Sequence, residues 1–207
     1  MKASAKVQVV MSNSAKKLIL ASTSIYRREL LERLRIPFDV ISPKVDETPL
    51  PGESTVDLAL RLAKAKAAAV AKDHPEAWVI GSDQVADLCG AAIGKPGNFE
   101  RAMAQLQLMR GATVTFQTAL CLMRGDVETT VNIPTEVTFR KLSDDVLEAY
   151  LHAEEPYDCA GSAKSEGLGI SLLESIKSDD PTALIGLPLI ALSGLLREAG
   201  FLIPAKK

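Results

Sequence analysis

The stretch KLILASTSIYRRELLERLR, residues 17–35, decides the fold of this chain. Its first five residues, 17–21, form a short apolar run that predicts a buried β-strand. Ser22, Thr23 and Ser24 follow, and these hydroxyl residues are typical of a helix N-cap. A helix is then expected to about Arg35, with its leucines on one face. A strand that runs directly into a helix is the first unit of an α/β fold.

The same alternation continues along the chain. Residues 38–41 predict a second strand, and a loop rich in proline, glycine and acidic residues follows it. Thr55 is expected to cap a helix over residues 55–72, in which apolar residues recur at spacings of three and four. The run 78–80 predicts a third strand that ends in Gly81-Ser82-Asp83.

The second half of the chain predicts a β-hairpin among further helices. Residues 113–123 and 128–140 read as two antiparallel strands joined by a turn at residues 124–126. Further helices are expected over residues 98–109, 143–153 and from Pro188 to Gly200. We therefore expect an α/β fold: an elongated mixed sheet with flanking helices, in which the hairpin forms a second lobe and leaves a cleft between two lobes.

Length and composition limit the classes of function. The 207 residues fit a single domain over residues 17–207, with residues 1–16 as a flexible N-terminal extension. Because the net charge is −2, nothing attracts the chain as a whole to nucleic acid or to anionic lipid. No apolar run is long enough to span a membrane, and no export signal is recognisable, so a cytoplasmic protein is expected.

Cysteine and histidine are too few and too scattered for most metal or nucleophile chemistry. Cys89, Cys121 and Cys159 form no CxxC pair, which favours a reducing compartment and three buried, inert thiols. With only two histidines, a zinc site or a Ser-His-Asp triad is not expected. Carboxylates, lysines and arginines are therefore the candidates for catalysis.

Familiar nucleotide-binding motifs are absent. The segment GAAIGK, residues 90–95, has three residues between its glycines where a P-loop has four, and Pro96 stands where Ser or Thr is required. Gly167-Leu168-Gly169 lacks the third glycine of a dinucleotide fingerprint. The chain contains neither GxSxG nor HExxH.

A phosphate site is expected at the first strand-to-helix turn. A helix N-terminus offers free N–H groups and partial positive charge, and Ser22, Arg27 and Arg28 lie beside it. Arginine opposes the helix dipole in a first turn, so this placement favours an anion as the reason. The alternative is an ordinary solvated helix start.

Two acidic positions follow predicted strands. Asp83 comes directly after WVIGS, and ligands of open α/β sheets bind at such strand ends. Asp46 and Glu47 lie in the loop after another strand, so a carboxylate there could meet Asp83 over a divalent cation. The alternatives are a turn or helix cap at Asp83 and an ordinary acidic loop at Asp46-Glu47.

Two lysines complete the candidate set. Lys66 interrupts an alanine-rich helix, and Lys95 stands in the turn Gly94-Lys95-Pro96. Each alone is an ordinary surface lysine. Together with the carboxylates and arginines they resemble a phosphoryl-transfer or pyrophosphohydrolase site, with cations for the phosphates and a base for water.

These residues also resemble a known family. The chain is similar to the Maf family of nucleoside triphosphate pyrophosphatases, which implies an elongated fold like that of the ITP pyrophosphatases, a site in a cleft and commonly a homodimer. The reaction implied is NTP plus water to NMP plus diphosphate. Six motifs carry the resemblance, in the family's order: LILASTSIYRRELL (18–31), VDET (45–48), RLAKAKA (61–67), GSDQV (81–85), GKP (94–96) and CAGSAKSEGLGI (159–170).

The resemblance assigns roles to the candidates. Asp83 would be the proton acceptor that activates the attacking water, and Glu47 would join Asp83 in holding Mg²⁺ or Mn²⁺. The residues implied to bind phosphate are Ser22, Arg27, Arg28, Lys66 and Lys95.

Three further positions look like the family's base-selecting set. Tyr26, Gln84 and Glu166 resemble the branch that acts on 7-methyl-GTP, whereas the dTTP/UTP branch typically has Arg, Thr and Gln there. Methylated guanine is cationic, so it gains a cation–π interaction with Tyr26, and Glu166 could accept from its N1–H and N2–H₂. Lys164 is a further candidate contact to the phosphates or the base.

The sequence therefore predicts a pyrophosphatase that converts 7-methyl-GTP to 7-methyl-GMP and diphosphate and so removes a modified nucleotide. One alternative is a dTTP/UTP pyrophosphatase of the same family. The other is a non-catalytic nucleotide sensor that inhibits septum formation. Intact Glu47, Lys66, Asp83 and Lys95 argue against the sensor.

Overall fold

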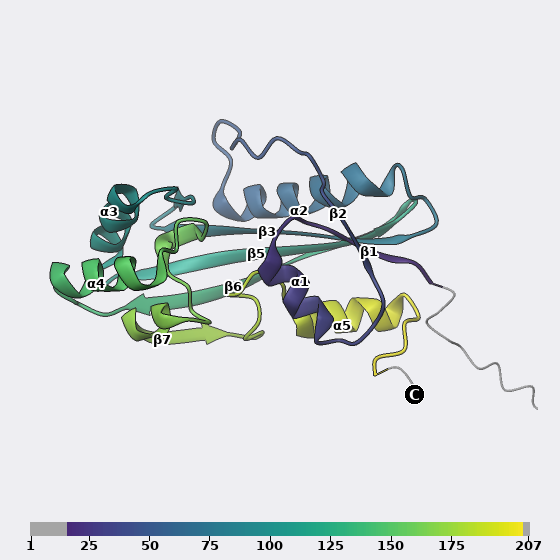
Figure 1. Ribbon diagram of the computed structural model, residues 1–207. Helices are drawn as coiled ribbons and strands as arrows, with labels where there is room; N and C mark the ends of the chain where they lie inside the picture. The colour runs from purple at the N-terminus through teal and green to yellow at the C-terminus, as the bar shows by residue number, and fades with distance from the viewer. Residues whose placement is uncertain (1–15, 205–207) are drawn as a thin grey trace, which may run out of the picture.

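A seven-stranded mixed sheet forms the centre of the molecule in the computed structural model, which describes residues 16–204 (Figure 1). The expected extension over residues 1–16 lies almost wholly outside these residues. Strand order is β2-β1-β3-β5-β6-β7, and β4 pairs with β3. The strands are β1 (Leu18–Ala21), β2 (Asp39–Ile41), β3 (Trp78–Leu88), β4 (Ala91–Ile93), β5 (Thr113–Arg124), β6 (Val127–Phe139) and β7 (Leu173–Ser178).

The sheet changes direction at β3. Strand β1 is parallel to both β2 and β3, whereas β3, β5, β6 and β7 are antiparallel in succession. The parallel part follows from the strand–helix alternation of the first 80 residues, and the antiparallel part from the predicted hairpin. The expected α/β class with a mixed sheet is confirmed.

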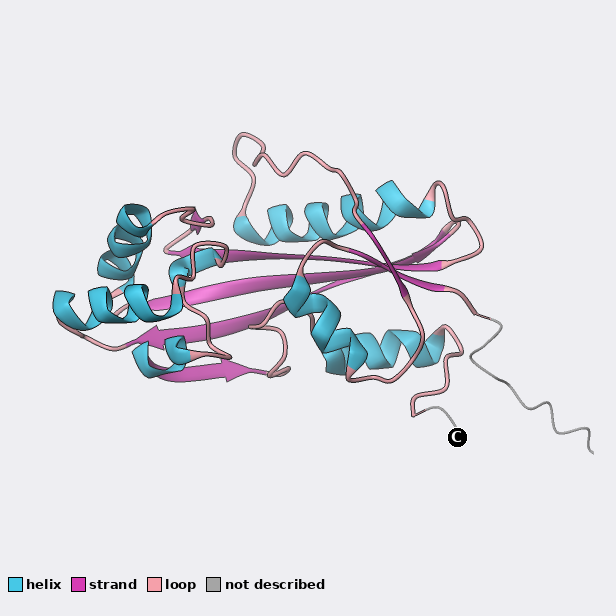
Figure 2. Cartoon of the chain, in the orientation of Figure 1, coloured by secondary structure: helices cyan, strands magenta, loops and turns pink. Residues whose placement is uncertain are grey.

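Helices cover both faces and one end of this long sheet (Figures 1 and 2). Helix α2 lies on one face, and α1 and α5 lie on the other, while α3 and α4 gather at the far end. In residues 16–204 no helix has the length and apolar character needed to cross a membrane. The helices are α1 (Ile25–Glu32), α2 (Thr55–Ala71), α3 (Phe99–Met109), α4 (Asp144–Glu154) and α5 (Leu189–Glu198).

The core is divided between two lobes. One apolar cluster joins α2 to the sheet and includes Val85, and a second joins α1 and α5 to the opposite face. A third begins at Ala86 and joins α3 and α4 to the far ends of β5 and β6. The boundary between lobes therefore falls on β3 at residues 85 and 86, next to Asp83.

Helix α2 approaches β3 closely at Gly81. A Cβ atom at Gly81 would lie 2.6 Å from the backbone nitrogen of Ala67 and closer still to the carbonyl oxygen of Ala63. Ala63 and Ala67 are fully buried. The alanine-rich helix and the strand glycine are therefore two sides of one contact, which only small residues permit.

Strand β3 is longer than the sequence predicted. The strand was expected over residues 78–80, but it continues to Leu88, so Asp83 lies within it and not at its end. The reason is β5, whose residues Thr115–Met123 pair with β3 across this whole stretch. Such long-range pairing has no signal in the local sequence around Asp83.

The other edge of β3 is interrupted. Strand β1 pairs with residues 78–81, and β4 pairs with residues 86–88. Residues 82–85, including Asp83 and Gln84, therefore have no strand beside them on this edge among the described residues. The parallel pairing of β1 with β3 ends at Gly81, two residues before Asp83.

Three local expectations were wrong. Helix α2 is capped by Ser54, whose hydroxyl accepts from the Asp57 backbone nitrogen, and not by Thr55. Cys89 is exposed, because it forms the β3–β4 turn with Gly90 at positive φ. Strands β4 and β7 had not been expected at all; both are short and depend on their partners.

Replacing Gly81 with alanine should destabilise the protein. The added methyl group meets backbone atoms of α2, which cannot move aside as a flexible side chain could. We expect Gly81→Ala to lower the free energy of unfolding by about 1–3 kcal/mol or more, as measured by urea denaturation. The control is Gly194→Ala in α5, where the added methyl meets no neighbour within 4 Å and helix propensity favours alanine by about 0.5–1 kcal/mol. Equal stability of the two variants would contradict the close contact.

Candidate functional site

A buried lysine joins the two predicted acidic positions. Lys66 points from α2 toward β3, and its Nζ lies 2.6 Å from Oδ1 of Asp83 and 2.6 Å from Oε1 of Glu47. The side chains of Lys66 and Asp83 are 8% and 10% exposed, whereas that of Glu47 is 58% exposed. Removing one partner of a buried pair leaves the other charge uncompensated, so each group depends on the others.

Two more cations act on this carboxylate pair. Burial raises the pKa of Glu47, but the hydrogen bond and charge of Lys66, with the charges of Lys95 and Arg27, outweigh it and lower the pKa overall. Burial lowers the pKa of Arg27, and the charges of Asp83 and Glu47 oppose this shift. The structure thus brings Arg27, Glu47, Lys66, Asp83 and Lys95 into one electrostatic cluster, to which three separate segments and two helices contribute.

Ser22 and Arg28 lie at the same turn but differ in placement. Ser22 is buried, and its hydroxyl accepts from the backbone nitrogen of Ser24, the N-cap of α1. Arg28 is exposed and pairs with Glu32 one turn later, at 3.0 Å. In this structure Arg28 therefore does not join Arg27 in the cluster, and its phosphate role stays a prediction.

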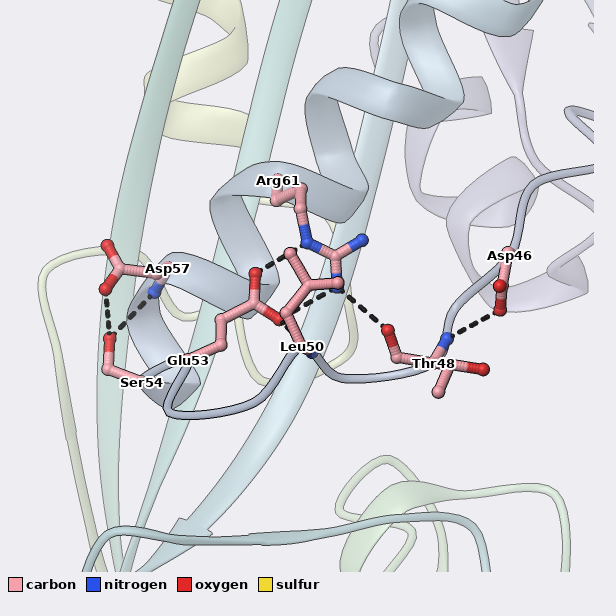
Figure 3. Close-up of polar contacts among 7 residues, drawn as sticks. All are labelled: Asp46, Thr48, Leu50, Glu53, Ser54, Asp57 and Arg61. Carbon is pink, nitrogen blue, oxygen red and sulfur yellow. Dashed lines mark hydrogen bonds and ion pairs between the residues drawn. The ribbon is translucent and has the colours of Figure 1, made fainter.

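The loop that carries Glu47 is tied to α2 by Arg61 (Figure 3). Arg61 Nη2 donates to the carbonyl of Thr48 at 3.1 Å, and its Nε and Nη2 donate to the two carboxylate oxygens of Glu53 at 2.5 and 2.8 Å. Glu53 also accepts from the backbone nitrogen of Leu50. This paired geometry fixes the loop one residue beyond Glu47, close to the helix that carries Lys66.

Tyr26 lies beside Lys164. The Lys164 ammonium is 5.5 Å from the centroid of the Tyr26 ring and 3.2 Å from Oε1 of Glu154. Burial and the charges of Cys159 and Asp158 raise the pKa of Tyr26 to about 12, against the charge of Lys164. The phenol is therefore neutral at physiological pH, and its ring lies within cation–π distance of the Lys164 ammonium.

Gln84 faces a different element from Asp83. Successive strand residues point to opposite faces, so Asp83 meets α2 while Gln84 meets residues 183–184. Its Nε2 lies 3.0 Å from the Ala183 carbonyl, 2.9 Å from the Leu184 carbonyl and 3.0 Å from Thr118 Oγ1. Two carbonyls fix the orientation of the amide, because they can only accept.

Glu166 lines a pocket of about 370 Å³. The side chain is exposed, and its charge acts on Lys164, the residue beside Tyr26. The same pocket is lined by Leu184, whose carbonyl accepts from Gln84. Of the three predicted base-selecting residues, Glu166 lines this pocket itself, Gln84 bonds to its lining residue Leu184, and Tyr26 lies beside Lys164. The pocket's other lining residues are Ser165, Ile170, Ile176, Ser178, Pro181 and Ile185.

The sequence reasoning missed the loop of residues 180–187. The Gly186 carbonyl accepts from Arg27 Nε at 2.8 Å and from Ser82 Oγ at 3.0 Å. Asp180 is 1% exposed, and its carboxylate accepts from Thr182 and from the first backbone N–H groups of α5. Asp180-x-Thr182 was a visible Asx-turn signal, but backbone carbonyls that position side chains leave no trace in a sequence.

Comparison with known proteins gives a consistent result. The model of the Maf-like protein family matches residues 17–199. The chain belongs to the Maf family. It is 62% identical to the 7-methyl-GTP pyrophosphatase of Cupriavidus metallidurans over 92% of this chain and 96% of that protein. It is 61% identical to the protein of that name from Ralstonia nicotianae (89% and 96%) and 58% identical to that from a Polaromonas species (96% and 91%).

A solved structure is also similar, but only distantly. The Staphylococcus aureus Ham1 protein aligns with 61% of this chain and 73% of its own at a TM-score of 0.44 and 15% identity. This likeness is too weak to bear on the expected relation to the ITP pyrophosphatases.

The carboxylates of this Maf protein fit a divalent cation that arrives with phosphate. Among residues 16–204 there is no group of three or more His, Cys, Asp or Glu side chains placed to hold a metal ion. Mg²⁺ is nevertheless commonly held by one or two carboxylates, with phosphate oxygens and waters as its other ligands. The carboxylates of Glu47 and Asp83 both contact the Lys66 ammonium. This pair of carboxylates fits a divalent cation whose other ligands are phosphate oxygens of a substrate.

The Arg61–Glu53 pair that holds the Glu47 loop, called the clamp below, should persist to low pH. Hydrogen bonds from Arg61 and from the Leu50 backbone lower the pKa of Glu53 from 4.5 to about 2. A depressed carboxyl pKa adds stability above pH 4.5, and this stability is lost as the pH falls from 4.5 to about 2. The Tm difference between the natural protein and Glu53→Gln should therefore be constant above pH 5 and shrink below pH 4.5.

The control for this pH series is Glu76→Gln. Glu76 also pairs with an arginine, Arg124, but its side chain is 90% exposed, and such surface pairs add little. Its Tm difference from the natural protein should be small at every pH. A Glu53→Gln difference that does not change between pH 7 and pH 3 would contradict the clamp.

Proposed function

We propose that this Maf protein hydrolyses 7-methyl-GTP to 7-methyl-GMP and diphosphate. The observation that carries the proposal is the Lys66 ammonium, 2.6 Å from both Asp83 and Glu47 at the interrupted edge of β3. Three relatives at 58–62% identity carry the name 7-methyl-GTP pyrophosphatase. The geometry supplies what this reaction needs, a base for water beside cations for phosphate.

Asp83 is the group we assign to the water. In the reaction the water oxygen bonds to phosphorus, the bond that joins the α- and β-phosphates breaks, and diphosphate leaves. Asp83 takes the proton that the water loses. The hydrogen bond from Lys66 orients the Asp83 carboxylate. Asp83 as a whole residue is 7% exposed, so it keeps a small contact with solvent.

Cations around Asp83 are assigned to the triphosphate. Lys66, Arg27 and Lys95 contribute three positive charges against the two carboxylates, and the buried hydroxyl of Ser22 lies at the start of α1. Arg28 is assigned to the phosphates as well, which requires it to leave Glu32. A divalent cation, Mg²⁺ or Mn²⁺, held by Glu47 and Asp83 would neutralise phosphate charge when it is bound.

The base is assigned to the region of Tyr26, Gln84 and Glu166. A 7-methylguanine carries a positive charge, which favours stacking on Tyr26 and hydrogen bonding to the Glu166 carboxylate. Uracil and thymine carry no such charge, and a carboxylate cannot donate to their O4. This chemistry favours 7-methyl-GTP over the dTTP/UTP alternative, and intact Asp83 and Lys66 favour an enzyme over a nucleotide sensor. A homodimer in the cytoplasm is part of the proposal.

Asp83→Asn should abolish turnover and retain nucleotide binding. Asparagine preserves the shape and can still accept from Lys66, but it cannot take a proton from water. We expect kcat for diphosphate release to fall by about 10²–10⁴-fold, with Kd for 7-methyl-GTP changed far less. Asp126→Asn, in the exposed β5–β6 turn, is the matched control and should have the natural rate. Turnover by Asp83→Asn at the natural rate would disprove the assignment of the base.

Glu166→Gln should weaken the preference for the cationic base. The neutral amide loses the charge-assisted part of a hydrogen bond, about 1 kcal/mol, which corresponds to a roughly fivefold to tenfold fall in the ratio of kcat/KM for 7-methyl-GTP to that for GTP. The measurement is diphosphate release with Mg²⁺ or Mn²⁺ on 7-methyl-GTP, GTP, UTP, dTTP and ITP. An unchanged ranking of substrates would rule out this role for Glu166, and preference of the natural protein for UTP or dTTP would overturn the proposed substrate.

A further inference from the structure

Gln105 on α3 bonds to two loops that carry residues assigned to the proposed nucleotide site. Its Nε2 donates to the Gly94 carbonyl at 3.1 Å, and its Oε1 accepts from the Ser162 hydroxyl at 2.6 Å. The Gly94 carbonyl can only accept, so it fixes which way the amide faces. A single half-buried side chain therefore connects two loops that lie 68 positions apart in the sequence, residue 94 and residue 162.

One end of this link leads to the phosphate cations. Gly94 directly precedes Lys95, whose charge acts on Glu47. Beyond the lysine, the backbone nitrogen of Gly97 donates to the Tyr157 carbonyl at 3.0 Å. The Lys95 turn is therefore held on both sides, by Gln105 and by the segment that leads into residues 158–166.

The other end leads to the base-selecting residues. Ser162 is fully buried, and it has a φ of 53°, directly after Gly161 at 72°. A left-handed serine is strained and persists only where its surroundings hold it. Its hydrogen bond to Gln105 is such a restraint, two residues before Lys164 and four before Glu166.

We propose that Gln105 is a positioning residue that sets the distance between the phosphate-binding turn and the base-binding loop. Gln105 does not itself contact substrate; it acts through Lys95 on one side and through Lys164 and Glu166 on the other. A triphosphate and its base are covalently joined, so their two subsites have to be held at a matching separation. Because this role concerns 7-methyl-GTP, it rests on the proposed function.

Variants can separate the two arms of the link. Gln105→Met removes both hydrogen bonds at similar side-chain length. Gln105→Glu keeps the acceptor for Ser162 but loses the donor to Gly94. Ser162→Ala removes only the hydrogen bond between Gln105 and the base-binding loop. The matched control is Gln107→Met, on the same helix, since Gln107 is exposed and bonds only to Asp144 at 3.2 Å.

The expected kinetic result is a split between rate and selectivity. Gln105→Met should lower kcat/KM for 7-methyl-GTP by about tenfold or more and also lower the 7-methyl-GTP to GTP ratio. Gln105→Glu should lower kcat/KM for both nucleotides alike, whereas Ser162→Ala should lower mainly the ratio. The double variant Gln105→Met, Ser162→Ala should lose no more selectivity than Gln105→Met alone. Values within twofold of the natural protein for all folded variants would overturn the role.

Hydrogen exchange tests the same link without activity. Gln105→Met should speed backbone exchange in both residues 94–97 and residues 160–166, and Gln107→Met in neither. Unchanged exchange in both segments would overturn the link. If the natural protein released diphosphate from no nucleotide, the proposed function would fail, and this exchange experiment would still decide whether Gln105 holds the two loops. Where Gln105→Met does not fold, Gln105→Glu and Ser162→Ala provide the same readouts.

Discussion

The close contact between α2 and β3 at Gly81 is the constraint on which the rest of the structure depends. Because no side chain stands between Gly81 and the backbone of Ala63 and Ala67, the helix lies near enough for Lys66 to reach across to Asp83. A larger residue at Gly81 would push the helix outward and separate this pair. The packing of small residues thus places a charged group inside the protein, where a buried ammonium is stable only beside its carboxylates.

The interrupted edge of β3 lies beside this buried charge. Strand β1 ends at Ala21 and β4 begins to pair at Ala86, so residues 82–85 have no strand beside them on this edge within residues 16–204. Groups from both faces act on Asp83 here: the charge of Arg27 on α1 interacts with it, and Lys66 reaches it from the opposite face. The alternation of a strand then separates two neighbours, since Asp83 turns to Lys66 on α2 and Gln84 turns to residues 183–184.

Backbone groups hold much of the periphery. The carbonyls of residues 183, 184 and 186 accept from Gln84, Thr118, Ser82 and Arg27, and Asp180 fixes that loop to the start of α5. Arg61 and Gln105 do the same for the Glu47 loop and for the two loops near Lys95 and Ser162. Each of these side chains bonds to a main-chain group, so a few polar residues help to fix the loops, in addition to the apolar packing of residues such as Leu187.

The sequence by itself determined the α/β class, the order of most helices and strands, and the residue types at the site, because these depend on local periodicity, capping residues and short motifs. From spacing alone it placed Ser22 beside the start of α1 and Lys95 in a turn, but it also placed Asp83 at a strand end, whereas Asp83 lies within β3. Only the tertiary structure decided that β3 runs on past Asp83, that Arg27 turns to Gly186, and that Gln105 joins two loops. These features arise from pairings between residues far apart in the chain, and neither propensity nor periodicity contains information about such contacts.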